Sequence, residues 1–520
     1  MPLTDYVTYA DAHKHCSKQA LWDLFDGDRE QLNLTHECID RHVGKGRAVR
    51  IAFADGREEA YTFDELARWS NRFANYLEKS GIRKGDRVAI MLEPGLPYYV
   101  ALFGAMKRGA VAVPMFTLFG KDALAARLDD CTPRLLVTTE EKELLAAGRE
   151  GLEVIVGDDT FLERLKSESA SYTASTSSND MAMYQYTSGT TRALPEAVQH
   201  RHRAVVTVMI AALYATGVRP GDLYCCPSSP AWGHGLWHGT LGPLALGVEI
   251  TAWSGPFDPD RFAQVLADYE ITNLSAAATH YRMIKNANAA AGHRFKLEKL
   301  TFTGEPIDSD TAQFVARTFG SEVRSIYGTT EVGVILAGYP GATDLPVKPG
   351  SLGKPMPGVE LAVHDPLGQP CAPGQMGEIV LRRRDGWFPT KDLGSIDEDG
   401  YFFHGGRADD VIISAGWTLS AVEIEDTLLK HPAVDEIAVI GVPDDVRGQV
   451  VKAFVVSARD ASAQDGSLEL ETELQDFARE RLGQHEYPRV VVFVNELPKT
   501  PAGKVNRKVL REQERVKGET

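Results

Sequence analysis

A regular alternation of helical and strand patterns constrains the fold of this chain more than any other feature. Thr62-Phe-Asp-Glu65 has the spacing of a helix capping box. An amphipathic run over 66–77 follows it, and Gly81 ends that run. Further on, a second helical pattern and several buried-strand patterns alternate: helix 98–107 and strands 87–92, 110–116, 135–139 and 154–157. Strands separated by helices favour parallel pairing through crossover connections, so the sequence predicts an α/β core.

The C-terminal part of the chain has a different pattern. After a Ser/Thr-rich loop over 167–180, the alternation resumes across 205–323. Beyond residue 420 we expect a compact α+β unit with helices at 420–430 and 470–482, strands at 437–442, 450–456 and 490–494, and a polar loop at 457–466. Gly405 and Gly406 interrupt the pattern before this unit, which suits a hinge. We therefore predict an N-terminal domain over 1–406 and a mobile C-terminal domain over 407–520.

Charge, cysteines and apolar runs narrow the functional classes. The formal net charge is −16, so a nucleic-acid partner is not expected. The six cysteines are scattered without CxxC or metal-ligand spacing, which favours a reducing compartment. The N-terminus lacks a signal-peptide layout, and the longest apolar helical run, 205–218, is too short to span a bilayer. We expect a soluble cytoplasmic protein, a monomer or homodimer, without a membrane partner.

The strongest local indication of a ligand lies in residues 184–198. Ser188-Gly189-Thr190-Thr191 follows a short aromatic strand pattern. Glycine lets the backbone approach an anion closely, and successive N–H groups and small hydroxyls can then wrap phosphate oxygens. No Gly-Lys pair follows, so this is not a GxxxxGK[ST] loop. An isolated cluster of this kind is more often an ordinary polar turn, and its meaning depends on the rest of the chain.

Six short motifs follow one another along the chain. They are Tyr186-Thr-Ser-Gly-Thr-Thr191, Thr303-Gly-Glu-Pro306, Tyr327-Gly-Thr-Thr-Glu331, Lys391-Asp392, Gly406-Arg-Ala-Asp-Asp-Val-Ile-Ile-Ser-Ala-Gly416 and Leu497-Pro-Lys-Thr-Pro-Ala-Gly-Lys504. Together they resemble the AMP-forming adenylating enzymes, which include acyl-CoA synthetases, nonribosomal peptide adenylation domains and firefly-type luciferases. The resemblance covers nearly the whole chain. It implies a large N-terminal domain of layered βα subdomains and a small mobile α+β C-terminal domain.

The resemblance also implies a reaction. Enzymes of this family convert a carboxylic acid and ATP into an acyl-adenylate, releasing pyrophosphate, and then transfer the acyl group to a thiol. A carboxylate is a poor electrophile, and joining it to AMP supplies a leaving group. The site must position phosphates, neutralise charge and exclude water. The implied cofactors are ATP, Mg²⁺ and CoA.

The resemblance assigns nucleotide contacts to several motifs. The β- and γ-phosphates would be held by the loop residues Thr187, Ser188, Gly189, Thr190 and Thr191. Mg²⁺ would be bound by Glu331 and Thr190, since this ion prefers oxygen ligands. The adenine slot would be formed by Gly304, Glu305, Pro306 and Tyr327, and the further nucleotide-binding residues would be Gly328, Thr329 and Thr330. Asp392 would accept hydrogen bonds from the ribose hydroxyls, and Arg407 would bind near the ribose and phosphate.

The C-terminal motifs imply residues for the two half-reactions. Lys504 is the main catalytic candidate, because in this family the matching lysine neutralises charge between carboxylate and α-phosphate during adenylation. Glu331 and Thr190 complete the catalytic set. Asp409 matches the hinge residue about which the small domain rotates afterwards. Ser414, Ala415 and Gly416 would then form the thiol channel, where a side chain at Gly416 would block the pantetheine.

Two positions depart from the family pattern. Glu196 stands where the phosphate loop usually carries lysine, which leaves a lysine–phosphate contact there in doubt. We hypothesise that Arg192 compensates. Thr418 stands where related synthetases often have a basic residue, so phosphate contacts from that position are also in doubt.

Residues 230–236 match the segment that carries the family's aromatic gate. Trp232 is our candidate for the gate, with His234 as the alternative. The expected acyl-pocket lining is Trp232, His234, Trp237, His238, Ala277, His280 and Gly328, although core packing is an equal alternative for Trp237 and His238. Gly328 replaces the bulky tryptophan of acetate-type synthetases, which disfavours acetate. The overall similarity is greatest to medium-chain, benzoate and alicyclic acid–CoA ligases.

These observations predict an AMP-forming carboxylate–CoA ligase, an acid–thiol ligase acting on an aromatic, alicyclic or medium-chain acid. The alternative is a standalone adenylation enzyme that loads a carrier-protein phosphopantetheine. The chain ends soon after Lys504 without an appended carrier module, which favours free CoA. A luciferase-like oxidase and a non-catalytic binding protein are disfavoured, the second because the catalytic set is complete.

Overall fold

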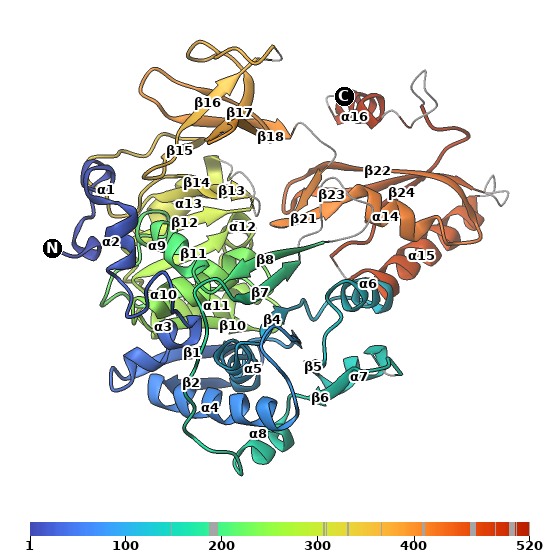
Figure 1. Cartoon of the computed structure of the whole chain (residues 1–520). Coiled ribbons are helices and arrows are strands. Elements are labelled where there is room, and N and C mark those ends of the chain that lie inside the picture. Colours follow the sequence, from blue (N-terminus) through green and yellow to red (C-terminus); the bar gives the residue numbers. More distant parts are fainter. Residues whose placement is uncertain are drawn as a thin grey trace. The chain divides into compact units, whose positions relative to one another are not determined.

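The computed structural model describes the chain except residues 147, 187–195, 305, 306, 308, 330, 331, 366, 408–410, 458–463, 484, 499–504, 506, 519 and 520. The described residues group into two compact units (Figure 1). Unit 1 comprises Met1–Thr117, Cys131–Tyr186 and Ala197–Gly406. Unit 2 includes Leu118–Asp130 and Arg407–Thr520.

One sheet of unit 1 has the strand order β6-β5-β3-β4-β7-β8. All neighbours in it pair in parallel except β7 and β8. Its strands are β3 (Arg87–Met91), β4 (Val111–Pro114), β5 (Leu135–Thr138), β6 (Glu153–Val156), β7 (Met181–Tyr186) and β8 (Ala197–Arg201). These positions confirm the predicted alternation, and the Ser/Thr/Gly loop falls between β7 and β8.

The second sheet of unit 1 has the order β16-β17-β18-β19-β15-β14-β13-β12-β11-β9-β10-β1-β2. Its central strands from β13 to β1 run parallel, and antiparallel strands flank them. The strands are β1 (Arg47–Phe53), β2 (Glu58–Thr62), β9 (Tyr224–Cys226), β10 (Ile250–Ser254), β11 (Asn273–Ala277), β12 (Lys299–Thr303), β13 (Val323–Thr329), β14 (Gly333–Ala337), β15 (Ser351–Pro355), β16 (Leu361–His364), β17 (Gly377–Arg383), β18 (Gly386–Ile396) and β19 (Phe402–Arg407). The α/β class predicted from the sequence is confirmed.

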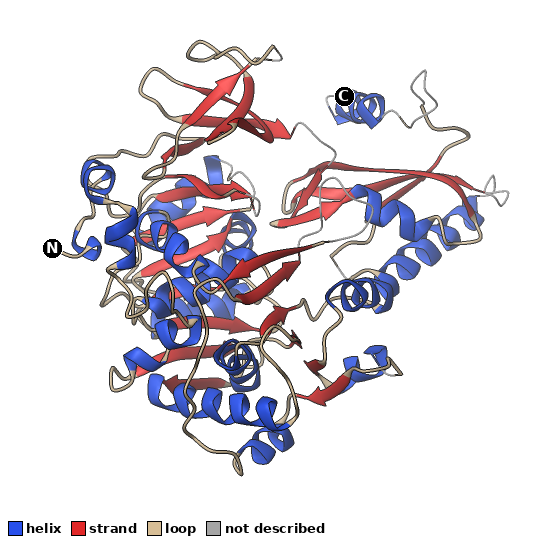
Figure 2. Ribbon diagram, viewed as in Figure 1, coloured by secondary structure: helices blue, strands red, loops and turns tan. Residues whose placement is uncertain are grey.

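Helices connect and cover these strands (Figure 2). The capping box forms as predicted at α4, where Thr62 N–H donates to Glu65 Oε2 at 2.8 Å and Glu65 N–H donates to Thr62 Oγ1 at 3.2 Å. The helices of unit 1 are α1 (Tyr9–His15), α2 (Lys18–Trp22), α3 (Leu34–Cys38), α4 (Phe63–Lys79), α5 (Leu96–Arg108), α7 (Glu140–Ala146), α8 (Asp159–Leu165), α9 (Ala204–Tyr214), the π-helix η3 (His234–Leu241), α10 (Gly242–Ala245), α11 (Pro259–Asp268), α12 (Ala278–Asn286), α13 (Ser309–Phe319) and the 3₁₀ turns η1 (Leu3–Asp5) and η2 (Asp40–His42).

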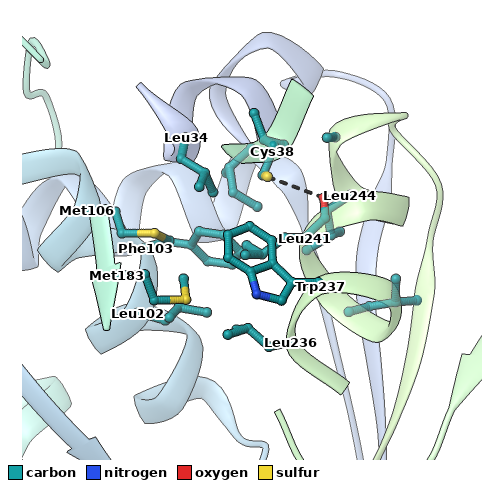
Figure 3. Packing of buried hydrophobic residues seen from close by; sticks show 14 of the residues in the cluster. Leu34, Cys38, Leu102, Phe103, Met106, Met183, Leu236, Trp237, Leu241 and Leu244 are labelled. Carbon is teal, nitrogen blue, oxygen red and sulfur yellow. Dashed lines mark hydrogen bonds between the residues drawn. The ribbon is translucent and has the colours of Figure 1, made fainter. Parts of the chain in front are cut away.

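The main core of unit 1 joins segments that lie far apart in the sequence. Figure 3 shows Trp237 of η3 packed among apolar side chains of α3, α5 and β7. Cys38 donates its thiol to Leu241 O at 3.4 Å within the same cluster. Because burying a large apolar side chain stabilises a fold by about 1.5–3 kcal/mol, this cluster fixes η3 against the rest of unit 1.

Unit 2 is a small α+β assembly. It contains a hairpin of β20 (Val411–Ser414) and β21 (Trp417–Ser420) and a second sheet of order β22-β23-β24. The other elements are β22 (Val434–Asp444), β23 (Gly448–Ser457), β24 (Val490–Phe493), α6 (Lys121–Cys131), α14 (Ala421–Leu428), α15 (Gln464–Arg481) and α16 (Arg507–Gly518). The predicted loop over 457–466 is wrong at its end, because α15 begins at Gln464.

The described part of the chain contains no helix with both the length and the apolarity needed to cross a bilayer.

Candidate active site

Tyr327 and Asp392 meet although 65 residues separate them. Tyr327 of β13 donates from Oη to Asp392 Oδ2 of β18 at 2.5 Å. Asp392 is 2% exposed, and Nε2 of His404 on β19 lies 3.5 Å from its Oδ1. A carboxylate can accept hydrogen bonds from two hydroxyls, and an aromatic face stacks on a base. The pair therefore has the chemistry for the sugar and base of a nucleoside, which are the groups that the resemblance assigns to it.

The backbone around Asp392 is strained in a way that fixes its direction. Lys391 has a φ of +64°, a left-handed conformation that is costly for a residue with a side chain. The Lys391 N–H donates to Glu378 Oε1 at 3.0 Å, and the Asp392 N–H donates to Thr390 Oγ1 at 3.2 Å. Such strain persists where the surroundings hold it and often accompanies a functional site.

Gly328 has a structural role that the sequence alone did not indicate. It lies where the pairing of β13 with β14 shifts register. A Cβ at this position would lie 2.0 Å from Gly333 O, far inside van der Waals contact. Close approach of the strands therefore requires glycine here, and the missing side chain is not evidence for a larger acyl pocket. Thr329 ends β13, and Gly304, with a φ of +91°, directly follows β12.

The predicted acyl-pocket residues lie beyond the carboxyl ends of parallel strands. β9 leads to Trp232 and η3, whereas β11 ends at Ala277 and leads into α12 with His280. Open α/β sheets bind their ligands at such strand ends. The rings of Trp232 and His234 are 5.3 Å apart, and those of His234 and His238 are 6.2 Å apart. Trp232, His234 and His238 are therefore close neighbours, as the sequence reasoning expects of a common site.

His234 is anchored between strands by hydroxyl groups. Its Nδ1 hydrogen-bonds with Ser228 Oγ and its Nε2 with Ser275 Oγ, both at 2.8 Å. Thr301 of β12 donates to Ser275 Oγ at 2.8 Å and extends the chain. Burial, together with His238 and His280, lowers the pKa of His234 well below its ordinary value. A neutral ring with both nitrogens engaged is suited to holding η3 in place.

His238 and His280 differ from His234 because the protein leaves ring nitrogens unused. Both side chains remain partly accessible to solvent. His280 Nδ1 accepts from the Ala277 N–H at 3.2 Å. His238 Nδ1 is enclosed and has no partner within the described part of the chain. Burial lowers the pKa of each ring to about 4, so both are neutral at pH 7.

Trp237 packs into the core. Its indole N–H donates to Gln185 Oε1 at 3.0 Å, and its ring lies 4.8 Å from that of His200. Of the two alternatives that the sequence left open for Trp237, core packing is the one seen. The residue supports η3 from the side of α3 and α5.

The predicted thiol-channel residues form a tight turn in unit 2. Ser414 pairs with Trp417, so Ala415 and Gly416 make a two-residue hairpin loop. Their φ values of +51° and +80° are those of a type I′ turn, which favours glycine. The Ala415 N–H donates to Arg447 O at 2.8 Å. The backbone conformation of the turn thus gives a second reason for glycine at position 416, in addition to the expected passage of pantetheine.

Several predicted site residues lie outside the described residues. They are Thr187, Ser188, Gly189, Thr190, Thr191, Arg192, Glu305, Pro306, Thr330, Glu331, Asp409 and Lys504. Arg407 is described by its backbone, as the last residue of β19. Among the described side chains, no group of three or more His, Cys, Asp or Glu residues is arranged to hold a metal ion.

Sequence reasoning missed Ser228, Ser275, Gln185 and His404. The first three hold His234 and Trp237 of η3 from other segments of the chain, and no local motif marks them. His404 follows two phenylalanines at the start of β19, where alternation would have placed it on a defined face of the strand.

Comparison with known proteins agrees with this geometry. Residues 40–387 match the family model of the AMP-binding enzymes, and residues 423–504 match that of the AMP-binding enzyme C-terminal domain. The chain belongs to the AMP-binding enzyme family. It is 30% identical to an acetyl-coenzyme A synthetase of Bacillus subtilis over 97% of its length and 94% of that protein. It is equally identical, at 30%, to 4-hydroxybutyrate–CoA ligase 1 of Metallosphaera sedula, over 95% of its length and 93% of that protein.

A solved structure shows the same architecture. The crystal structure of an acyl-CoA synthetase from Brucella canis superposes with a TM-score of 0.72 at 30% identity, covering 98% of this chain and 99% of that one. The family match and these relatives support AMP-forming acyl-CoA ligase activity, with ATP and CoA as co-substrates. They do not favour a carrier protein as acceptor.

Proposed function

We propose that the protein activates an aromatic, alicyclic or medium-chain carboxylic acid as its acyl-adenylate and passes the acyl group to CoA. The observation that carries the proposal is the Tyr327–Asp392 contact, because it joins two family motifs that are distant in sequence and that the resemblance assigns to the nucleoside. The cluster around Trp232 and His234 in the same unit supplies an aromatic environment for the acid.

In the first step a carboxylate oxygen attacks the α-phosphorus of ATP, and the bond to the β-phosphate breaks to release pyrophosphate. Asp392 would hold the ribose and Tyr327 the adenine, so that the α-phosphorus is presented in line. Gly304, Thr329 and Arg407 would complete the nucleotide contacts, with 187–191 on the phosphates. Lys504 would neutralise the charge that builds between the carboxylate and the phosphate.

Mg²⁺ is expected at Glu331 and Thr190. Bound there, it would neutralise charge on the phosphate oxygens that the 187–191 loop holds.

In the second step the CoA thiolate attacks the acyl carbonyl, and AMP leaves with the electrons of the C–O bond. We propose a hinge at Asp409 between domains 1–406 and 407–520, with Ser414, Ala415 and Gly416 lining the thiol path. The tight type I′ turn at Ala415 and Gly416 supports this assignment, since it presents backbone rather than side chains.

The acid class rests on the similarity of 406–423 and the stretch to residue 452 to medium-chain, benzoate and alicyclic acid ligases. Gly328 no longer contributes, since strand pairing explains it. The two curated relatives are named for acids as different as acetate and 4-hydroxybutyrate, and therefore leave the class open.

The test is an acid panel with the purified full-length protein, ATP, Mg²⁺ and either CoA or a phosphopantetheinyl carrier. Pyrophosphate release and thioester formation are followed in each arm. We expect both products with CoA for at least one aromatic, alicyclic or medium-chain acid. Pyrophosphate without a CoA thioester would remove the ligase assignment, and thioester from acetate alone would remove the acid class.

The role of Arg192 needs a separate test. If it compensates for the missing phosphate-loop lysine, Arg192→Ala raises the KM for ATP severalfold with an unchanged KM for the acid. Glu196→Lys should lower the KM for ATP in the same assay. An unchanged KM for ATP in Arg192→Ala would sink the hypothesis.

A further inference from the structure

Several histidines of unit 1 have a ring nitrogen without a partner among the described residues, and two of them, His238 and His280, belong to the segments that carry the predicted acyl-pocket residues. Nδ1 of His238 is fully enclosed and has no hydrogen-bond partner among the described residues. On His280, Nδ1 accepts from the Ala277 N–H, and Nε2 has no partner among the described residues. An enclosed polar atom without a partner destabilises a fold, so its retention calls for an explanation.

Both rings interact electrostatically with the anchored His234. The ring centroids of His238 and His234 are 6.2 Å apart, and His238 follows His234 by one turn of η3. His280 stands in the first turn of α12, beyond the carboxyl end of β11, the strand that carries Ser275. Ser275 holds His234 by a 2.8 Å hydrogen bond. Both free rings therefore belong to the group of side chains around Trp232 that we assign to the acyl site.

Their neighbours are apolar or already engaged. The His280 ring lies 4.5 Å from the ring of Phe257. Trp232 lies 5.3 Å from His234, whose own nitrogens are occupied by Ser228 and Ser275. A hydrogen-bonding group that enters this region therefore meets His238 and His280 as its available partners.

We propose that His238 and His280 recognise an uncharged hydrogen-bonding oxygen on the acyl group, so that the preferred acid carries a hydroxyl or keto group away from its carboxylate. This inference rests on the proposed function, because it requires the acid to bind beside Trp232. It narrows the acid from a plain hydrocarbon to an oxygen-substituted one.

The state of the rings agrees with an uncharged substituent. Burial lowers the pKa of both to about 4, so both rings are neutral at pH 7. His238 then has one donor and one acceptor nitrogen, whereas His280, whose Nδ1 accepts from Ala277, offers a donor at Nε2. A second carboxylate would need a positive partner, which neutral imidazoles do not supply. A hydrocarbon would leave their nitrogens unpaired, and sites built to bond a hydroxyl reject analogues that lack it.

The test compares acids that differ only in hydroxyl against methyl. The full-length protein is assayed with ATP and CoA for 6-hydroxyhexanoate against heptanoate and for 4-hydroxybenzoate against 4-methylbenzoate. We expect kcat/KM for the hydroxyl member of at least one pair to exceed that of its methyl partner by about tenfold or more. Equal values, or a preference for methyl in both pairs, would overturn the inference and leave the ligase function standing.

Substitutions at the two histidines test whether they cause the preference for the hydroxyl acid. His238→Leu and His280→Leu should each reduce the hydroxyl-to-methyl ratio about tenfold by lowering the rate on the hydroxyl acid, and His238→Gln should retain part of the ratio. His364→Leu is the matched control, because His364 of β16 is also buried with an unpartnered Nε2 among the described residues. Its ratio should stay that of the wild type.

The outcomes are separable. A ratio that survives both leucine variants would overturn the assignment to these rings. If a leucine variant fails to fold, the wild-type ratio and the glutamine variant decide. No pyrophosphate with any acid would overturn the proposed function and this inference together.

Discussion

The side chain of Asp392 is held in place by its neighbours. One carboxylate oxygen accepts from Tyr327, and the left-handed backbone at Lys391 sets the direction of the side chain. The carboxylate is therefore positioned before a nucleotide arrives. The contribution of the Asp392 charge and that of the Tyr327 hydroxyl can therefore be measured with separate variants.

Asp392→Asn should raise the KM for ATP and lower kcat/KM for ATP by about 10- to 100-fold, because hydrogen bonds to a charged acceptor are worth about 1.5–3 kcal/mol. Tyr327→Phe keeps the stacking face and should cost about tenfold or less. The KM for the acid should stay within about twofold in both variants. Steady-state kinetics with ATP varied at saturating acid measures this, and an Asp392→Asn enzyme with wild-type KM for ATP would contradict the ribose assignment.

Sequence reasoning at the residue scale succeeded where a contact is local or a motif is specific. The Thr62–Glu65 capping box closes within four residues and was predicted fully. The anchoring of His234 joins Ser228 and Ser275, which are 47 residues apart and are brought together only by sheet order. Trp237 stayed open between core and pocket, because an indole near a glycine-rich segment suits either.

At the scale of elements, the β20–β21 hairpin depends on its two left-handed residues. A β-branched residue at Gly416 is disfavoured at positive φ by about 1–2 kcal/mol, whereas asparagine tolerates it. Gly416→Val should therefore lower the melting temperature of the protein, and Gly416→Asn should leave it nearly unchanged. Thioester formation should fall in both, because each side chain enters the proposed thiol path while adenylation continues. Asparagine with full thioester activity would remove Gly416 from that path.

The predicted end of an element is wrong where the sequence lacks apolar periodicity. The helix α15 was expected at residue 470, yet it begins at Gln464. Leu470 is buried, whereas Leu468 is 61% exposed, so the apolar stripe starts one turn later than the backbone helix. The place of α6 could not be predicted from the sequence either, because nothing in residues 118–130 marks this helix as part of unit 2.

The attachment of α6 within unit 2 depends on Arg127. Its side chain is 2% exposed, its guanidinium carbon lies 3.9 Å from the centre of the Phe119 ring, and its Nη1 lies 3.5 Å from Glu423 Oε1. Removing one member of a buried ion pair leaves the other charge uncompensated, at a cost of about 3–5 kcal/mol. Arg127→Ala should lower the free energy of unfolding of unit 2 by that order in urea titrations. Lys121→Ala, at an exposed position on the same helix, should change it little, and equal effects would contradict the role of Arg127.

For the whole molecule, unit 1 buries several histidines in neutral form. Burial is the main cause that lowers the pKa to about 4 for His42, His200, His202, His238 and His280. The unperturbed pKa of histidine is about 6.5, so the unfolded chain takes up protons before the folded one as the pH falls. The stability that these rings contribute is fully present above about pH 6.5 and is lost between that pH and about 4.

The buried histidines therefore make the stability of unit 1 sensitive to acid at pH values above those at which most carboxylates titrate. The free energy of unfolding should fall steadily from pH 6.5 to 4.5, with a slope that corresponds to an uptake of several protons. His238→Gln removes one of these groups and should reduce the slope by about one proton, since glutamine does not titrate. Urea unfolding at half-unit pH steps, on wild type and variant, measures both slopes. A wild-type stability that stays flat across this range would show that the rings are solvated in the folded state, which would also remove the basis for uncharged recognition at His238.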